Sequence, residues 1–187
     1  MLLPPRGSKP GVSAAQIRMN DNERWFLVCV FASFLSFTLI ARWYVVPRLR
    51  GVPRASALLP LLLVNTFRTV GLTFMIPQVT GATLPYAFAA PAAFGDLTAA
   101  ALAFLSVFAL RLRWPFALIL VWVFNIEGSV DLLFAYYQGR ALDYFSFQVG
   151  PVWYIPTFIV PLLLVIHVLI FWLLLRPSPA VRKAGDQ

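Results

Sequence analysis

Five apolar runs of about bilayer length constrain this chain more than any other feature of its sequence. A helix needs roughly 20 mostly apolar residues to cross the hydrocarbon core of a membrane. Runs that meet this length lie at 25–46, 56–77, 84–110, 114–137 and 152–176. Pro and Gly mark most of the joints between them, and no run has the alternation of a strand. The sequence therefore predicts an all-α fold, an integral membrane bundle of five transmembrane helices.

The composition agrees with a membrane protein. Of 187 residues, 60% are hydrophobic and only 12% are charged, which is too few for the surface of a soluble domain of this size. The formal net charge of +8 is spread between the apolar runs, so it indicates membrane orientation and no nucleic-acid partner. The single cysteine, Cys29, excludes an intrachain disulfide. No Gly-rich phosphate loop, HExxH, CxxC or GxSxG motif is present, so neither a cofactor nor a metal is predicted.

Basic residues indicate how the helices are threaded. They gather in the joints after the first and third runs and in the C-terminal segment, as Arg42, Arg48, Arg50, Arg54, Arg111, Arg113, Arg176, Arg182 and Lys183. The opposite joints contain only Arg140, with Asp143 close by. Because positive loops stay on the cytoplasmic side, we expect the N-terminus outside and the C-terminus inside, in a bacterial inner membrane.

Three segments follow from this threading. We expect residues 1–24 to be a disordered N-terminal extension, residues 25–176 to be the transmembrane domain, and residues 177–187 to be a cytoplasmic tail. The apolar stretch at the start of the chain is too short for a signal peptide. The extension places basic residues on the outer side, and most of that exception disappears if translation starts at Met19.

Ionisable side chains lie inside the predicted helices. Each costs about 2.5–3.5 kcal/mol at the centre of a span on insertion scales. With a rise of about 1.5 Å per residue, Arg68, Asp96 and Glu127 all come near mid-bilayer, and Asp131 lies about one turn further out. We therefore expect Arg68 to pair with Asp96 or Glu127, or to bridge two carboxylates in a fork.

Glu127 and Asp131 lie one turn apart on one face of the fourth helix. Three carboxyl groups and one guanidinium leave an excess of negative charge, so we expect one carboxyl to keep its proton near neutral pH. The candidate ligand-binding residues are Arg68, Asp96, Asn65, Asn125, Trp122 and Gln138. If the site is catalytic, the candidate acid and base are Glu127 and Asp131.

Two further features favour structural roles. Alanines surround Asp96 at helical spacing, and such small strips let membrane helices approach closely. His167 lies among apolar residues, and one His cannot supply bis-His haem ligation within a chain. Its role stays open.

The strings "NTFRTVGLTFMIPQV", "LPYAFAAPAAFGDLTAA" and "YIPTFIVPLLLVIHVLIFWLLLR" resemble a group of small bacterial inner-membrane proteins, and the resemblance covers nearly the whole chain. It implies the membrane location but no activity. A looser analogy is with the emopamil-binding family of sterol isomerases, which are also small helical membrane proteins with carboxylates in a lipid-facing cavity. No motif of that family can be placed on this sequence, so it implies no residue roles.

Four functions remain open at this point. The favoured one is binding of a small amphiphile, lipid or apolar metabolite, with Arg68 holding an anionic or carbonyl group and Glu127 and Asp131 setting the proton state. The alternatives are an intramembrane acid/base enzyme, isomerase-like, on an isoprenoid-type substrate, a proton-coupled carrier, and a structural or assembly subunit. The predicted partner is membrane lipid or a small apolar ligand, and a homo-oligomer is compatible with the sequence.

Overall fold

The computed structural model describes residues 14–81, 84–142, 144 and 149–176. These residues form helices and contain no strand. Five helical spans are long and apolar enough to cross a membrane: Asp21–Arg50, Arg54–Met75, Tyr86–Arg111, Ala117–Ala141 and Gly150–Leu175. The all-α, five-helix prediction is thereby confirmed.

Several spans are built from more than one type of helix. In chain order the elements are α1 (Ala14–Ile40), the π-helical η1 (Ala41–Val45), α2 (Val46–Arg50), α3 (Arg54–Asn65), the 3-10 helix η2 (Thr66–Met75), α4 (Pro77–Thr80), α5 (Tyr86–Arg111), α6 (Ala117–Ala141), the 3-10 helix η4 (Gly150–Trp153), the π-helical η5 (Ile155–Ile159) and α7 (Val160–Leu175).

The ends of the chain differ in part from the expectation. Helix α1 begins at Ala14, inside the segment 1–24 for which the sequence predicted disorder. Residues 1–13 and the predicted tail 177–187 lie outside the described residues. The first span is therefore preceded by helix, at least from Ala14 onward.

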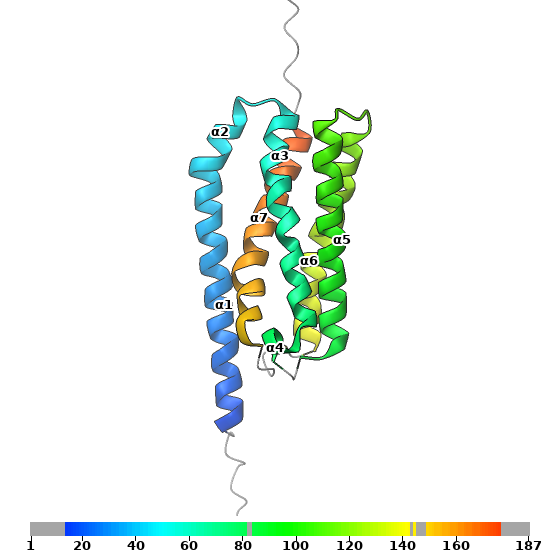
Figure 1. The fold of residues 1–187 in the computed structure, drawn as a ribbon. Helices are drawn as coiled ribbons and strands as arrows, with labels where there is room; N and C mark the ends of the chain where they lie inside the picture. Colours follow the sequence, from blue (N-terminus) through cyan, green and yellow to red (C-terminus); the bar gives the residue numbers. More distant parts are fainter. Residues whose placement is uncertain (1–13, 82–83, 143, 145–148, 177–187) are drawn as a thin grey trace, which may run out of the picture.

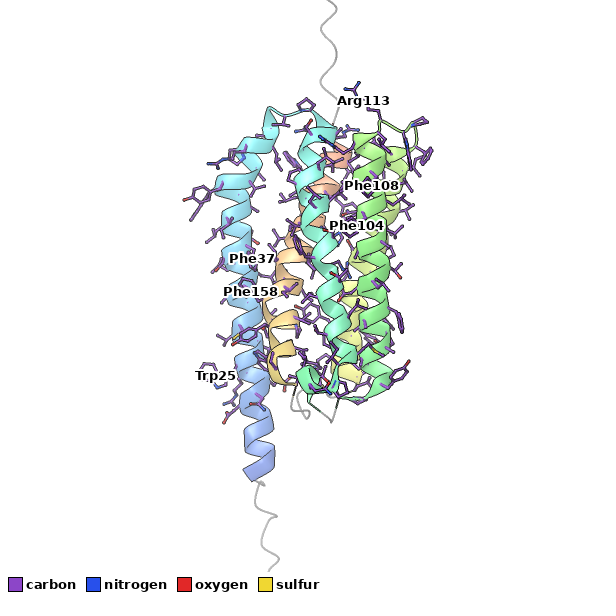
Figure 2. The ribbon with its side chains drawn as sticks, in the orientation of Figure 1. Trp25, Phe37, Phe104, Phe108, Arg113 and Phe158 are labelled. Atoms are coloured by element: carbon purple, nitrogen blue, oxygen red, sulfur yellow. The ribbon has the colours of Figure 1, made fainter. Side chains whose placement is uncertain are left out.

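Four spans form a compact bundle and the first stands at its side (Figure 1). Helix α5 packs on α3, η2 and α6, whereas α1 packs on α7 and η5. Only 11% of the most apolar part of the first span is buried, against 50% for the last span. Figure 2 shows Phe37 of α1 and Phe158 of η5 meeting across this contact, with ring centroids 5.0 Å apart. Helix α1 is thus the most loosely held wall of the bundle.

A polar layer divides the apolar core into two clusters. One cluster contains Leu58, Leu62, Phe124 and the buried residues of α7 from Ile166 onward. The other contains Phe74, Phe88, Leu132 and the first buried residues of α7. Between the two clusters along the chain lie the buried or partly buried polar residues Asn65, Arg68, Asp96, Asn125 and Asp131, and buried His167 directly follows Ile166, the first α7 residue of the other cluster. Four helical spans contribute to this layer, so it holds the bundle together as well as forming the candidate site.

Candidate functional site

Arg68 of η2 forms the centre of an ion triad with Asp96 and Asp131. Its Nε donates to Asp96 Oδ1 at 2.7 Å, and one terminal nitrogen donates to Asp131 Oδ2. The other terminal nitrogen donates to the carbonyl oxygen of Gly128 at 3.1 Å. The guanidinium is fully buried and links η2 to both α5 and α6. The predicted pairing of Arg68 with Asp96 or Glu127 is therefore confirmed for Asp96, and the second carboxylate of the fork is Asp131.

The 3-10 winding of η2 aims Arg68 at α5. A 3-10 helix has three residues per turn, so side chains three apart lie above one another. Arg68, Gly71 and Phe74 have this spacing and are all buried. Thr66 and Thr73 each donate their hydroxyl to the carbonyl three residues earlier, at 2.7 Å, which matches this tighter winding. A 3-10 stretch of ten residues is unusually long, and it turns the face that contains Arg68 toward α5.

Each group of the triad lies against a glycine on a neighbouring element. Asp96 occupies the space that a Cβ at Gly71 would need, and Asp131 occupies the space at Gly95. A Cβ at Gly128 would lie 2.8 Å from a terminal nitrogen of Arg68. Any larger residue at these positions would displace the charged groups. The sequence analysis missed Gly95 and Gly128; a glycine at the depth of each buried charge is the signal that could have identified them.

His167 of α7 is paired with Asn125 of α6. Asn125 Nδ2 donates to the main-chain oxygen of His167 at 3.2 Å, which leaves Asn125 Oδ1 as the acceptor for His167 Nδ1 at 2.7 Å. This network assigns a proton to Nδ1. Nε2 has no hydrogen-bond partner among the described residues. The pair joins α6 to α7, which agrees with a structural contribution of His167.

The other candidate residues lie at the margins of the site. Glu127 Oε2 is buried and has no hydrogen-bond partner among the described residues. Asn65 donates to the carbonyl oxygen of Leu61 at 2.9 Å. Trp122 packs on Phe171 with ring centroids 5.7 Å apart, within the cluster that contains Leu58. Two cavities, described below, lie beside the triad and beside α1, and neither Trp122 nor Gln138 lines them.

A small acidic cavity lies directly beside the carboxylates. Its volume is about 40 Å³, and Asp96 and Asp131 line it together with apolar side chains. Arg68 does not line it, because its guanidinium is enclosed by the triad. The expectation that Arg68 holds an anionic group of a ligand is therefore not supported by the geometry. The polar atoms that face this cavity belong to carboxyl groups.

A larger apolar cavity of about 480 Å³ adjoins the acidic cavity. It lies between α1 and α6, and the two cavities share Phe88, Ala135, Tyr136 and Pro156 as wall residues. The wall supplied by α1 consists of Glu23, Phe26, Leu27, Val30 and Phe34. The sequence analysis missed this wall, since apolar residues on a membrane helix give no signal that separates a cavity lining from a lipid contact.

Few polar groups line the apolar cavity. At its edge Arg140 of α6 forms an ion pair with Glu23 of α1. Tyr136 donates its hydroxyl to the carbonyl oxygen of Pro156 at 2.8 Å. Tyr144, which lies outside the spanning helices, also lines this cavity, and burial raises the pKa of its phenol above the usual range. Tyr144 is therefore a neutral hydroxyl at any physiological pH.

Residues 25–175 match the model of a protein family described as Domain of unknown function (DUF8737). The chain belongs to this family. The matched region contains the whole ion triad and, apart from Glu23, every residue that lines the two cavities. No curated protein and no solved structure matches the chain.

The chemistry available at this DUF8737 site is that of carboxyl groups in an apolar setting. Among the described residues, no three His, Cys, Asp or Glu side chains are grouped to hold a metal ion. Each triad carboxylate uses one oxygen for Arg68 and offers the other as a hydrogen-bond acceptor. The site is thus suited to accept hydrogen bonds from a ligand or to compensate a positive charge.

Proposed function

We propose that this DUF8737 protein binds a small amphiphile or lipid in the membrane. The apolar part of the ligand would occupy the cavity between α1 and α6, and its polar end would reach Asp96 and Asp131. One observation carries the proposal: the apolar cavity and the acidic cavity share four wall residues, Phe88, Ala135, Tyr136 and Pro156. One elongated molecule can therefore contact both.

The cavity sizes suit such a ligand. A volume of about 480 Å³ falls within the range of about 300–1,000 Å³ that is typical of small-molecule sites. The acidic cavity, at about 40 Å³, has room for a small polar group, since a cavity needs only about 10–15 Å³ to hold a water molecule. The arrangement supports a ligand with a long apolar body and a compact polar end.

The charge of the site supports a hydrogen-bond donor or a cation as that polar end. With both carboxyls ionised, Arg68, Asp96 and Asp131 sum to one negative charge. An anionic ligand group would be repelled in this low-dielectric setting, whereas a protonated amine or a hydroxyl would be attracted. We therefore favour a basic or alcoholic amphiphile over a fatty acid.

The alternatives have less support. An acid/base enzyme that uses Glu127 needs that carboxyl to face the substrate, but Glu127 lines neither cavity. A proton-coupled carrier needs a polar path to both sides of the membrane, and beyond the polar layer the bundle is filled by Leu58, Leu62 and Phe124. A purely structural triad would not need a cavity beside its carboxylates.

We also propose that the protein lies in a bacterial inner membrane with its N-terminus outside. The support is the distribution of arginines described above. The α2–α3 turn, the α5–α6 turn and the end of α7 lie at one end of the bundle (Figure 1), and the arginine-rich segments are these three. By the positive-inside rule that end faces the cytoplasm.

Binding can be tested with amphiphiles that share one alkyl chain and differ in the polar end. Purified protein in detergent would be titrated with dodecylamine, dodecanol and dodecanoate, and binding would be measured by native mass spectrometry. Ala135 faces both cavities, so Ala135→Trp should abolish binding. Val130→Trp is the matched control, because Val130 lies on the same helix and is 61% exposed.

We expect the amine and the alcohol to bind the wild type and the Val130→Trp variant, and the carboxylate to bind at least about tenfold more weakly, which corresponds to about 1.4 kcal/mol. If Ala135→Trp binds all three as well as Val130→Trp does, the amphiphiles do not enter the cavity and the proposed function is wrong. Mass spectrometry of lipids that co-purify with the protein would then identify the natural ligand class.

A further inference from the structure

A third cavity lies at the opposite end of α6 from the apolar cavity. Its volume is about 390 Å³, and it is lined by Arg54 of α3, by Arg113 and Trp114 of the α5–α6 turn, and by apolar residues that include Leu110 and Leu118. Figure 2 shows Arg113 at the end of the bundle where α5 ends and α3 begins. We call it the arginine cavity; the proposed amphiphile site does not use it.

Arg113 occupies a backbone position that normally favours glycine. Trp114 N–H donates to the carbonyl of Ala109 at 2.9 Å, and Arg113 N–H donates to that of Leu110 at 3.3 Å. These two bonds are the Schellman motif that ends α5, in which the residue at the position of Arg113 is left-handed and is usually Gly. Arg113 has φ of 56°, which is unfavourable for a residue with a Cβ. A residue with a side chain is therefore unusual at this position.

Arg54 is held in place on the other side of the cavity. One of its terminal nitrogens donates to the main-chain oxygen of Arg176. Arg176 itself donates to the carbonyls of Leu49 at 2.9 Å and Val52 at 2.6 Å. Because the acceptor of the Arg54 side chain is a neutral main-chain oxygen, the bond holds Arg54 in place but does not compensate its positive charge. Its Nε is buried and has no hydrogen-bond partner among the described residues.

The two cavity arginines have no counter-charge in the described part of the chain. The ion pairs found there involve Arg24, Arg68 and Arg140 but neither Arg54 nor Arg113. Two guanidinium groups that face one cavity without a carboxylate favour an anion with several oxygens, since guanidinium binds phosphate oxygens through paired N–H donors. The apolar part of the wall, ending at the exposed Leu118, is suited to an acyl chain.

We propose that the arginine cavity binds the phosphate of an anionic phospholipid. Arg54 and Arg113 contact the phosphate oxygens, Trp114 lies at the level of the headgroup, and the first part of an acyl chain follows Leu118 along α6. An indole at this depth fits, because tryptophan is enriched at the membrane–water interface. This site is independent of the amphiphile site between α1 and α6.

The test uses the full chain in detergent, titrated with dioleoylphosphatidylglycerol and with dioleoylglycerol, which lacks the phosphate. Bound lipid is counted by native mass spectrometry. The variants are Arg54→Gln and Arg113→Gln, and the matched control is Arg111→Gln, since Arg111 lies at the same end, is exposed and does not line the cavity.

We expect the wild type to bind the phospholipid and not the diglyceride. Each lining variant should lose affinity for the phospholipid by roughly fivefold, the factor that corresponds to one basic side chain at an anionic lipid, and the control should lose clearly less. Equal losses in all three variants would show only general attraction to the arginine-rich end and would overturn the proposal. So would stabilisation by inorganic phosphate alone that equals the effect of the lipid.

A second measurement keeps folding and binding apart. Arg113→Gly removes the strain of the left-handed residue, so without lipid the melting temperature should rise, by about 2–4 °C for a small gain in stability in a chain of this size. The same variant should lose affinity for phosphatidylglycerol as Arg113→Gln does. A variant that is more stable and binds the lipid normally would remove Arg113 from the site and overturn the proposal.

Discussion

Replacing Arg68 by methionine tests whether the ion triad holds the bundle together. Methionine has an unbranched side chain about as long as the aliphatic stem of arginine, so it fills much of the space of that stem. What it removes is the charge and three hydrogen bonds, to Asp96, Asp131 and the Gly128 carbonyl. The two carboxyls would then remain in an apolar layer without their cation.

The size of the effect follows from burial. Arg68 has no exposed side-chain surface, and the side chains of Asp96 and Asp131 are 10% and 16% exposed. Removing one partner of a buried ion pair costs about 3–5 kcal/mol, because the remaining charge is left uncompensated. At about 2–4 °C per kcal/mol for a chain of 150–250 residues, the melting temperature should fall by about 6–20 °C.

Thermal unfolding in detergent, followed by tryptophan fluorescence, measures this shift. The matched variant is the triple change Arg68→Met, Asp96→Asn, Asp131→Asn, which removes all three charges together. It should recover more than half of the lost stability, because buried ion pairs replaced as a whole are often nearly neutral. If Arg68→Met alone lies within about 1 kcal/mol of the wild type, the carboxyls were not balanced by Arg68 and the reasoning about the triad fails.

Three further changes test the packing, the mechanism and the threading. Gly128→Ala should destabilise the protein by about 1–3 kcal/mol through overpacking, because its Cβ would lie 2.7 Å from Cε1 of the α7 histidine, whereas Gly51→Ala has no atom within 4 Å and should change the melting temperature little. Glu127→Gln should leave both folding and amphiphile binding intact, as measured by the melting temperature and by native mass spectrometry; loss of binding without unfolding would return Glu127 to the site. A cysteine at Ser178, in a chain lacking Cys29, should react with an impermeant thiol reagent only after the cells are opened, and labelling in intact cells would reverse the proposed orientation.

The five spans could be predicted because bilayer thickness fixes the length of each apolar run. The second run was predicted at 56–77, and the structure gives Arg54–Met75. What the sequence could not indicate is how loosely the first span is held. Its mean hydropathy of 1.9 lies within the range of 1.5 to 2.9 of the other spans, and hydropathy does not distinguish a side chain that faces lipid from one that faces a cavity.

Part of the site could be predicted from depth along the helices. Arg68 and Asp96 lie at similar depth on neighbouring spans, and their pairing follows from the cost of leaving either charge in lipid. The choice between Glu127 and Asp131 could not be predicted in the same way. These two positions differ by only about 40° around α6, at about 100° per residue, so a small rotation of α6 decides which carboxyl reaches Arg68.

Glycine packing sets that rotation. Gly128 lets α6 approach the side chains of Arg68 and His167, and Gly95 lets α5 accept Asp131. With both contacts in place, Asp131 pairs with the guanidinium, whereas Glu127 forms no ion pair among the described residues. Small residues permit close approach of backbones in apolar membrane helices. In the polar layer, the glycines likewise leave room for the charged side chains of the neighbouring helix.

The completed triad is compatible with the proposed ligand site next to it. Asp96, Asp131 and the Gly128 carbonyl compensate the charge of Arg68 from within the protein, so the polar layer is stable without a ligand. A ligand would therefore meet hydrogen-bond acceptors that are already in place, and its binding would not have to order them. The remaining barrier to entry is the wall formed by α1. That helix is the least buried of the five spans. Its ion pair with α6, Glu23–Arg140, has an exposed arginine side chain, and solvent-exposed ion pairs contribute only about 0–1 kcal/mol to stability. The lowest-cost route to the carboxylates therefore runs from the lipid between α1 and α6, which suits a ligand that arrives dissolved in the membrane.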